Sequence, residues 1–324
     1  MLRLILLCLL ALTALSCAPR SEELSMRHAD VALAATLYLP RSNGAHPAIV
    51  LIPGSGPFNR AQYRGFAEFF ARQGIAALIY DKRSLGAPNG TGLVSFNDLT
   101  EDAQAAVQLL KGRSDINADQ IGLWGGSEGA GVAAAVAAQA NDVAFLVSVS
   151  GGGVTYAELV MYQLANRLRA QGYSEAEVAA ALAVVRQLHE FVRTGNDGAA
   201  LQNALDEAWR HRWAEGAVPR TIPSAAERAA APEWRELDGD PAQMWAQVKV
   251  PVLAFWGERD ELVPVAQSVA RISAALRRAG NQHVTIKIIA GADHNLNRAT
   301  GPSTDAEYLK TMVDWIWQTV KQPQ

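Results

Sequence analysis

The sequence contains very little cysteine, and what it has is confined to one end. Only Cys8 and Cys17 are present, both within the first 17 of 324 residues. Cleavage at or after Ser16 would leave at most one cysteine, so the mature chain would form no internal disulfide. Cysteines and histidines nowhere gather at the spacing of metal ligands, so the sequence predicts no metal site.

Charge of one sign is also lacking. The 29 Lys and Arg residues nearly balance the 32 Asp and Glu residues, and the net charge is −3. Basic residues are scattered, without a long run or stripe, whereas a nucleic-acid partner requires a basic patch. We therefore expect no nucleic-acid binding. Tandem repeats and low-complexity tracts are absent from the sequence as well.

The first residues resemble a targeting segment. Arg3 is followed by an apolar run over residues 4–15 and then by small residues, which is the layout of a signal peptide. The run is short for a bilayer span, although an uncleaved anchor helix is the alternative. We expect residues 1–17 to be a signal and the protein to be exported from a bacterium-like cell.

Cys17 leaves two outcomes of that export open. Ala14-Leu15-Ser16-Cys17 resembles a lipobox, in which the cysteine becomes the acylated N-terminus and attaches the protein to a membrane. Ala14-x-Ser16 also fits a plain signal-peptidase site, which would release the protein. The expected location is therefore periplasmic, either free or as a membrane-anchored lipoprotein.

Apolar runs alternate with helical patterns over most of the remaining chain, and 49% of the residues in the full sequence are hydrophobic. Continuous apolar strands separated by helices indicate a mainly parallel, doubly wound sheet covered on both faces, an α/β fold. Strands are expected at residues 31–39, 48–52, 75–80, 121–124, 144–149, 251–256 and 284–289. Helices are expected at residues 63–72, 98–110, 128–140, 266–278 and 306–321.

The alternation stops over residues 155–247, where the pattern is almost wholly helical. This block separates two parts of one α/β core, residues 25–154 and 248–324. We expect a helical cap over the carboxyl ends of the strands, where open α/β sheets bind ligands. Its helices are predicted at residues 156–170, 174–193 and 199–213. Its aromatic residues, including Tyr156, Tyr162, Trp209 and Trp213, are expected mainly to pack its helices, with some lining an acyl pocket.

Residues 125–129 read Gly-Gly-Ser-Glu-Gly, which is a G-x-S-x-G pattern. It follows a short apolar strand and opens a helix rich in alanine and glycine, which is the strand–turn–helix setting of a nucleophile elbow. The small residues let the strand and the helix approach, and the helix N-terminus favours a developing oxyanion. Ser127 is therefore a candidate nucleophile; the alternative is that it only caps the helix.

A serine nucleophile needs a base and an acid that orients the base. Of six histidines, only His294 lies in a loop at the carboxyl end of a predicted strand, in "AGADHNLN". Asp260 follows another strand in "VPVLAFWGERDELVP" and is the predicted acid, with Glu258 as the alternative. The chain order Ser127, Asp260, His294 is the order of α/β-hydrolases.

With these motifs the sequence resembles the α/β-hydrolase superfamily over residues 28–153 and 250–320. The segments "IVLIPGSGPFNR", "LIYDKRSLG", "GGSEG", "GERDELVP" and "GADH" look like successive landmarks of that family. The chain is similar to bacterial carboxylesterases of the dienelactone hydrolase and prolyl-oligopeptidase-like kind. The resemblance implies an oxyanion hole made by the backbone N–H groups of Ser55 and Glu128, with Gly56 as the alternative to Ser55. Pro53 stands where many members have histidine.

The resulting prediction is an exported serine hydrolase, a carboxylesterase for small to medium acyl esters. His294 takes the Ser127 proton, Asp260 holds the imidazole, and an acyl-enzyme forms and is hydrolysed. No cofactor is implied, and nothing in the sequence indicates an oligomeric state. The alternatives are a peptidase or amidase, a thioesterase, or a non-catalytic binding protein on the same scaffold.

Two arginines fit two different roles. Arg60 and Arg83 could each bind a substrate carboxylate, but pairing with Asp81 or another loop carboxylate is at least as consistent with the sequence. They are therefore left out of the predicted site.

Overall fold

The computed structural model describes residues 19–28, 31–83, 94–139, 142–298 and 306–321. They form an eight-stranded sheet of order β1-β2-β4-β3-β5-β6-β7-β8. The pairs β1–β2 and β2–β4 are antiparallel and all the others are parallel. The strands are β1 (Arg20–His28), β2 (Val31–Leu39), β3 (His46–Ile52), β4 (Ala76–Tyr80), β5 (Ile116–Gly126), β6 (Phe145–Val149), β7 (Val252–Gly257) and β8 (Val284–Ile289).

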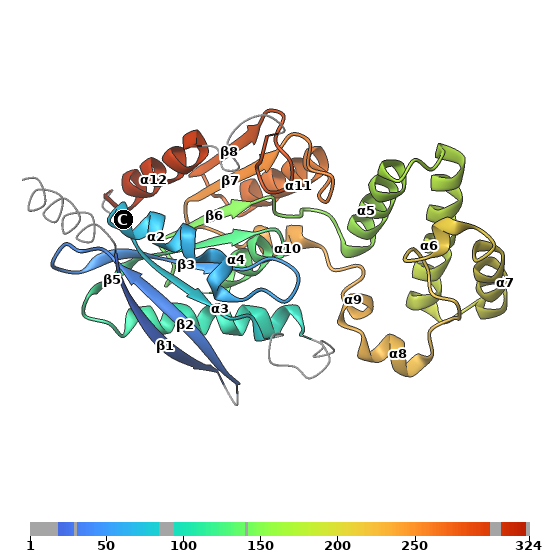
Figure 1. The fold of residues 1–324 in the computed structure, drawn as a ribbon, viewed down its shortest axis with the longest axis horizontal. Helices are drawn as coiled ribbons and strands as arrows, with labels where there is room; N and C mark the ends of the chain where they lie inside the picture. The colour runs from blue at the N-terminus through green and yellow to red at the C-terminus, as the bar shows by residue number, and fades with distance from the viewer. Residues whose placement is uncertain (1–18, 29–30, 84–93, 140–141, 299–305, 322–324) are drawn as a thin grey trace, which may run out of the picture.

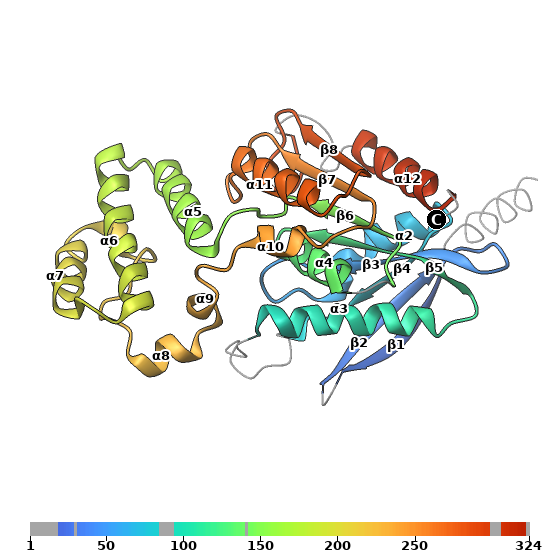
Figure 2. The same cartoon turned by 180° about the vertical axis from the view of Figure 1, so that it is seen from behind.

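The central strands are apolar on both faces because helices cover both sides of the sheet. Every residue of β3, β4, β6 and β7 is buried, as expected of parallel strands between two helical layers. One face packs against α3 (Phe96–Lys111), α4 (Glu128–Gln139), α10 (Pro241–Trp245) and α11 (Val265–Arg278) (Figure 2). The other packs against α2 (Arg64–Arg72) and α12 (Ala306–Lys321).

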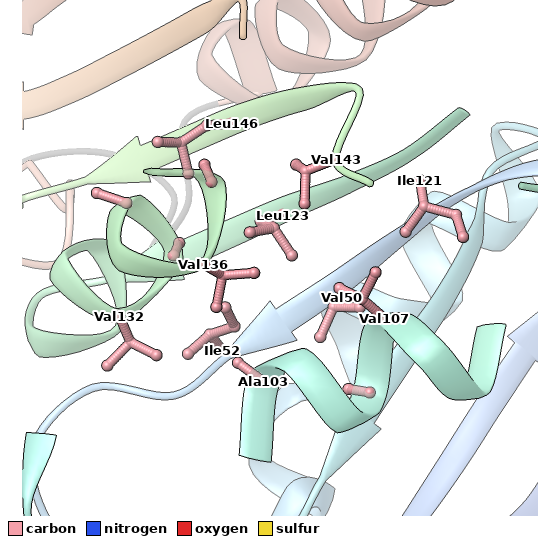
Figure 3. Packing of buried hydrophobic residues seen from close by; sticks show 14 of the residues in the cluster. Val50, Ile52, Ala103, Val107, Ile121, Leu123, Val132, Val136, Val143 and Leu146 are labelled. Carbon is pink, nitrogen blue, oxygen red and sulfur yellow. The ribbon is translucent and has the colours of Figure 1, made fainter. Parts of the chain in front are cut away.

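Branched side chains fill the layer between the sheet and the helices α3 and α4. Figure 3 shows valines of α4 and small residues of α3 meeting apolar side chains of β3, β5 and β6. This packing fixes α4 against the strand that precedes it, and so fixes the turn between them. The labelled residues are Val50, Ile52, Ala103, Val107, Ile121, Leu123, Val132, Val136, Val143 and Leu146.

A helical insertion lies in the chain between β6 and β7. Its helices are α5 (Tyr156–Ala170), α6 (Glu175–Thr194), α7 (Gly198–Ala208), α8 (Ala225–Ala230) and α9 (Pro232–Arg235). It has an apolar core of its own, separate from the two layers beside the sheet. In Figure 1 the arrowhead of β6 points toward it, and α6, α7 and α8 lie away from the sheet.

The helix starts of the insertion are encoded locally. The side chains of Thr155, Ser174 and Ser224 each accept a hydrogen bond from a backbone N–H in the first turn. The side chain of the glutamate three residues later accepts the backbone N–H of the capping residue. Such capping boxes satisfy two backbone donors that the helix itself leaves unpaired. This local signal explains why the predicted helix 156–170 has the bounds of α5.

Several sequence expectations differ from the structure, and the strand predicted at residues 121–124 is the longer β5, Ile116–Gly126. The sequence predicted no strand before residues 31–39, but the structure has β1 at Arg20–His28. Its residues are mostly exposed and polar, so β1 depends on its pairing with β2 rather than on apolar patterning. The helix predicted over 199–213 ends at Ala208, and a short 3-10 helix, Arg212–Ala214, carries the buried Trp213.

A further difference is at the end of the predicted cap. α10 lies within residues 155–247, but Ala242 and Trp245 pack in the layer of α3, α4 and α11. Within the described residues, no helix is both long and apolar enough to cross a bilayer. The expected signal at residues 1–17, with Cys8 and Cys17, lies outside the described residues.

Candidate active site

Ser127 sits between β5 and α4 in a strained backbone conformation. Its φ is 55°, a left-handed value that a residue with a side chain rarely adopts. Its N–H donates to the Val149 carbonyl at 2.8 Å, which ties the turn to the end of β6. The residue is partly exposed. The turn therefore places a partly exposed serine at the carboxyl edge of the sheet.

The turn is compact enough that only glycine fits on either side of it. A Cβ on Gly125 would lie 2.1 Å from the Gly129 carbonyl oxygen, and one on Gly129 would lie 2.3 Å from the Ile52 carbonyl oxygen. Real side chains do not reach such distances, so the G-x-S-x-G pattern has a steric reason here. An ordinary helix cap imposes no such requirement.

His294 and Asp260 form a buried pair. His294 Nδ1 lies 2.8 Å from Asp260 Oδ2, and the two residues are 7% and 3% exposed. The other carboxylate oxygen, Oδ1, accepts the backbone N–H groups of Leu262 and Val263 at 2.9 and 2.8 Å. These bonds fix which edge of the carboxylate faces the imidazole.

The loops that carry the pair are joined by backbone bonds. Arg259 N–H donates to the Ala292 carbonyl, and Glu258 N–H donates to the Ile289 carbonyl, so the loops after β7 and β8 form one unit. Glu258, the alternative acid, instead accepts the Gly291 N–H with its carboxylate. The structure therefore pairs Asp260, and not Glu258, with His294.

Ser150 connects this unit to the serine turn. It is buried, it has a φ of 52°, and its Oγ donates to the His294 carbonyl at 2.7 Å. Its neighbour Val149 accepts the Ser127 N–H. Ser127 and His294 are thus held by adjacent residues at the end of β6. No hydrogen bond joins their side chains among the described residues.

The residues expected to form the oxyanion hole lie on two segments. Ser55 is exposed in the loop after β3. Glu128 is the first residue of α4, so its N–H is among those that a helix leaves without an internal partner. Gly54 lies against the turn, since a Cβ there would be 3.4 Å from the Cβ of Ser127. The segment carrying Ser55 therefore approaches the serine directly.

A lysine connects those two segments. Lys82 is 6% exposed, and its Nζ lies 2.8 Å from the Gly54 carbonyl oxygen and 2.6 Å from Glu128 Oε2. Tyr63 adds a second contact on the same loop, since its hydroxyl accepts the Gly54 N–H at 3.4 Å. Burial raises the pKa of Tyr63, so it keeps its proton at neutral pH.

The first helix of the insertion contacts the loop of the candidate acid. Tyr162 Oη donates to the Asp260 carbonyl at 2.8 Å, Asn166 to Glu261 at 2.9 Å, and Gln163 to Leu262 at 3.1 Å. Three side chains of α5 thus bind three successive carbonyls. Tyr162 was expected to pack or to line a pocket, and its hydroxyl contact was not foreseen.

The two arginines left out of the site have carboxylate partners. Arg60 pairs with Asp81 and Glu23. Arg83 donates two bonds to the buried carboxylate of Asp102, at 2.7 and 2.6 Å, and pairs with Asp98. Neither needs a ligand to neutralise it.

Sequence reasoning missed Lys82 and Ser150. Lysine is ordinarily exposed, and a serine before three glycines resembles a turn, so neither residue stood out as functional. The only signal in the sequence was that each residue lies just beyond a predicted strand, β4 or β6. In the described part of the chain, no group of three or more His, Cys, Asp or Glu residues could hold a metal.

The chain is similar in sequence to a known family and to several known proteins. The model of the family described as X-Pro dipeptidyl-peptidase (S15 family) matches residues 29–294, a range that contains Ser127, Asp260 and His294. The Quorum-quenching protein AidA of Acinetobacter baumannii is 34% identical over 121 residues, 37% of this chain and 40% of that protein. Esterase EstD of Thermotoga maritima is 24% identical over 281 residues, 84% of this chain and 60% of that protein. The chain thus spans less than two thirds of these relatives.

Among solved structures, the alpha/beta hydrolase GrgF from Penicillium sp. sh18 superposes with a TM-score of 0.61 at 19% identity. The superposition covers 93% of this chain and 99% of that one. Together with the mostly parallel sheet, this likeness identifies the architecture as the α/β-hydrolase fold.

Proposed function

The chain belongs to the X-Pro dipeptidyl-peptidase (S15) family of α/β-hydrolases. We propose that it is a serine hydrolase that acts on carboxylic esters. The observation that carries the proposal is the buried pair of His294 and Asp260, 2.8 Å apart, at the sheet edge that carries the strained Ser127. A serine, a histidine and an acid in this order and setting have the roles of a catalytic triad.

The steps follow from what each group can do. His294 accepts the Ser127 proton as Oγ attacks the ester carbonyl, and Asp260 stabilises the imidazolium that forms. The N–H groups of Ser55 and Glu128 donate to the oxyanion. His294 then gives its proton to the leaving alcohol. The acyl-enzyme is hydrolysed by a water that His294 deprotonates, which restores Ser127.

An ester substrate is favoured by the similarity to Esterase EstD, which extends over 84% of this chain. The description of the family favours a second candidate, cleavage of a peptide bond after proline by the same three residues. The two bonds differ in the leaving group that His294 must protonate. A p-nitrophenyl ester and glycyl-prolyl-p-nitroanilide therefore distinguish the candidates directly.

The test is hydrolysis of p-nitrophenyl esters, from acetyl to long acyl chains, by the purified protein and by Ser127→Ala. We expect short and medium esters to be cleaved, and the rate to fall about 10⁴-fold or more in the variant. Equal rates in both proteins would remove Ser127 from the mechanism. Cleavage of the anilide alone would make the protein a peptidase.

We also propose that residues 1–17 direct export and that Cys17 is the lipidated residue of a membrane-anchored form. The support is the apolar run after Arg3 and the sequence Ala14-Leu15-Ser16-Cys17. Radiolabelled palmitate should label the wild-type chain expressed in bacteria and not Cys17→Ser. Absence of label from both, with a soluble periplasmic product, would favour signal-peptidase cleavage instead.

A further inference from the structure

Lys82 is a buried cation that touches both segments expected to stabilise the oxyanion. Its Nζ lies 2.8 Å from the Gly54 carbonyl oxygen and 2.6 Å from Glu128 Oε2. Its backbone N–H donates to the Phe58 carbonyl at 3.2 Å, so Lys82 holds the loop after β3 at two points. Removing an ammonium from water is unfavourable unless it finds partners, and these acceptors supply them.

The contact with Gly54 determines where the next amide points. The Gly54 carbonyl and the Ser55 N–H belong to one planar peptide group, in which C=O and N–H point in opposite directions. An ammonium that holds the carbonyl therefore sets the direction of the Ser55 N–H. It also polarises the peptide group, and hydrogen bonds in a chain strengthen one another.

The contact with Glu128 acts on the other segment. Glu128 directly follows Ser127, and its side chain is one third exposed. The bond to Nζ holds the first turn of α4 at a fixed distance from the Gly54–Ser55 peptide group. One ammonium thus spans the gap between the two expected donors.

We propose that Lys82 is a positioning residue of the oxyanion hole, holding the Ser55 and Glu128 N–H groups toward one point. This rests on the proposed serine-hydrolase mechanism. Lys82 does not touch the substrate; it acts through the Gly54 carbonyl and the Glu128 carboxylate. Its loss therefore lowers transition-state stabilisation and leaves ground-state binding of the ester largely unchanged.

Arg83 provides a matched control. It is the next residue in the chain, and its side chain is 13% exposed in a pair with the buried carboxylate of Asp102. Asp102 lies on α3 and not on either oxyanion segment. Arg83→Met therefore removes a comparably buried cation without touching the Gly54–Ser55 peptide group.

The experiment measures kcat and KM for p-nitrophenyl butyrate in the wild type, Lys82→Met, Lys82→Arg and Arg83→Met. It also measures inhibition by an aryl trifluoromethyl ketone. Ser127 Oγ adds to the ketone carbon, His294 takes the proton, and the carbonyl electron pair becomes an oxyanion that needs the hole. Circular dichroism and the melting temperature establish that each variant is folded.

For Lys82→Met we expect kcat to fall about 100-fold, inhibition by the ketone to weaken in parallel, and KM to stay within about threefold. Arg83→Met should lose stability but keep kcat per folded molecule. Lys82→Arg should recover part of the loss, because it retains a cation at this place. If Lys82→Met does not fold, Glu128→Ala serves in its place and should weaken ketone inhibition about tenfold.

The proposal is overturned if folded Lys82→Met keeps kcat and ketone affinity within about threefold of the wild type. It is also overturned if Arg83→Met loses as much as Lys82→Met, since the role would then be structural. Ser127→Ala is measured in the same experiment to test whether the serine-hydrolase mechanism itself holds. An active Ser127→Ala overturns the mechanism, whereas an inactive one with an unaffected Lys82→Met overturns only the role of Lys82.

Discussion

The α/β core around the sheet, here called the sheet domain, and the helical insertion of α5 to α9 are stabilised by different contacts. In the sheet domain, backbone bonds and buried pairs fix the candidate site, as between Ser127 and Val149 or between His294 and Asp260. The insertion has a separate apolar core and reaches the site through side-chain bonds from α5. The candidate residues therefore all lie beside the sheet, and the side chains of α5 reach the Asp260 loop.

The largest expected effect comes from breaking the compact turn around Ser127. Gly129→Ala would place a Cβ 2.3 Å from the Ile52 carbonyl oxygen. We expect an ester hydrolysis rate at least about 100-fold lower, because the serine must move, and a stability loss of about 3 kcal/mol or more. Kinetics and urea unfolding measure both.

Gly131→Ala is the matched control for that change. It lies in the same helix, and its Cβ would meet only the Phe96 ring, at 3.4 and 3.5 Å. We expect near wild-type activity and unchanged or slightly higher stability. If both alanines are tolerated equally, the steric account of the G-x-S-x-G pattern is wrong.

The second prediction separates the two cores. Leu205 is fully buried in the core of the insertion, and Leu205→Ala should cost about 2–5 kcal/mol there. Hydrogen exchange should speed up across α5, α6 and α7, with β3 and β5 protected as before. Leu123→Ala in the sheet domain is the comparison, and it should raise exchange in β3 and β5. If Leu205→Ala speeds up hydrogen exchange equally in the insertion and in β3 and β5, the two regions unfold as a single cooperative unit and the prediction is wrong.

The third prediction breaks the contact between the insertion and the candidate acid. Tyr162→Phe removes the hydroxyl that donates to the Asp260 carbonyl at 2.8 Å. If the lost hydrogen bond weakens transition-state stabilisation by about 1 kcal/mol, kcat falls about fivefold and KM changes little. Tyr173→Phe, elsewhere in the insertion, should have no effect. An unchanged kcat in Tyr162→Phe would mean that the insertion does not influence Asp260.

The smallest effect concerns the ion pair between α5 and α11. The Arg271 guanidinium beside Glu158, at 2.6 and 2.7 Å, lowers the pKa of that carboxylate to about 2. The folded pKa lies below the unfolded value of 4.5, so the stabilisation is complete above pH 4.5 and is lost as the pH falls toward 2. Both side chains are about 40% exposed, so screening should hold the contribution to under about 1 kcal/mol.

Thermal unfolding of the wild type and Glu158→Gln checks this sign. The two proteins should differ at pH 6 and converge below pH 3. Glu175→Gln, whose carboxylate pairs with Arg169 within the insertion, is the control for a pair that does not join the two regions. A difference between wild type and Glu158→Gln that grows as the pH falls would contradict the assignment.

Much of this arrangement could be predicted from sequence where the signal is local. The predicted helices 156–170 and 306–321 and the strand 284–289 have the bounds found in the structure. Apolar patterning, caps and turn residues are all contained in such segments. The parallel α/β sheet could be predicted from the alternation of these elements, and the α/β-hydrolase fold from the resemblance that the motifs carry.

The rest depends on contacts between distant segments. β1 is polar and mostly exposed, and it becomes a strand only because β2 pairs with it. Lys82 is a lysine in a polar stretch, and its burial depends on Gly54 and Glu128 approaching it. Asp260 could be favoured over Glu258 by sequence, but only the geometry shows which carboxylate meets His294.

The central claim is that Ser127 is a nucleophile activated by His294, and covalent labelling tests it most directly. A fluorophosphonate forms a bond to an activated serine oxygen as fluoride leaves. Mass spectrometry should find one phosphonyl group, on the peptide containing Ser127, with no label on Ser127→Ala and much slower labelling of His294→Ala. Label on another residue, or equal labelling of Ser127→Ala, would contradict the account.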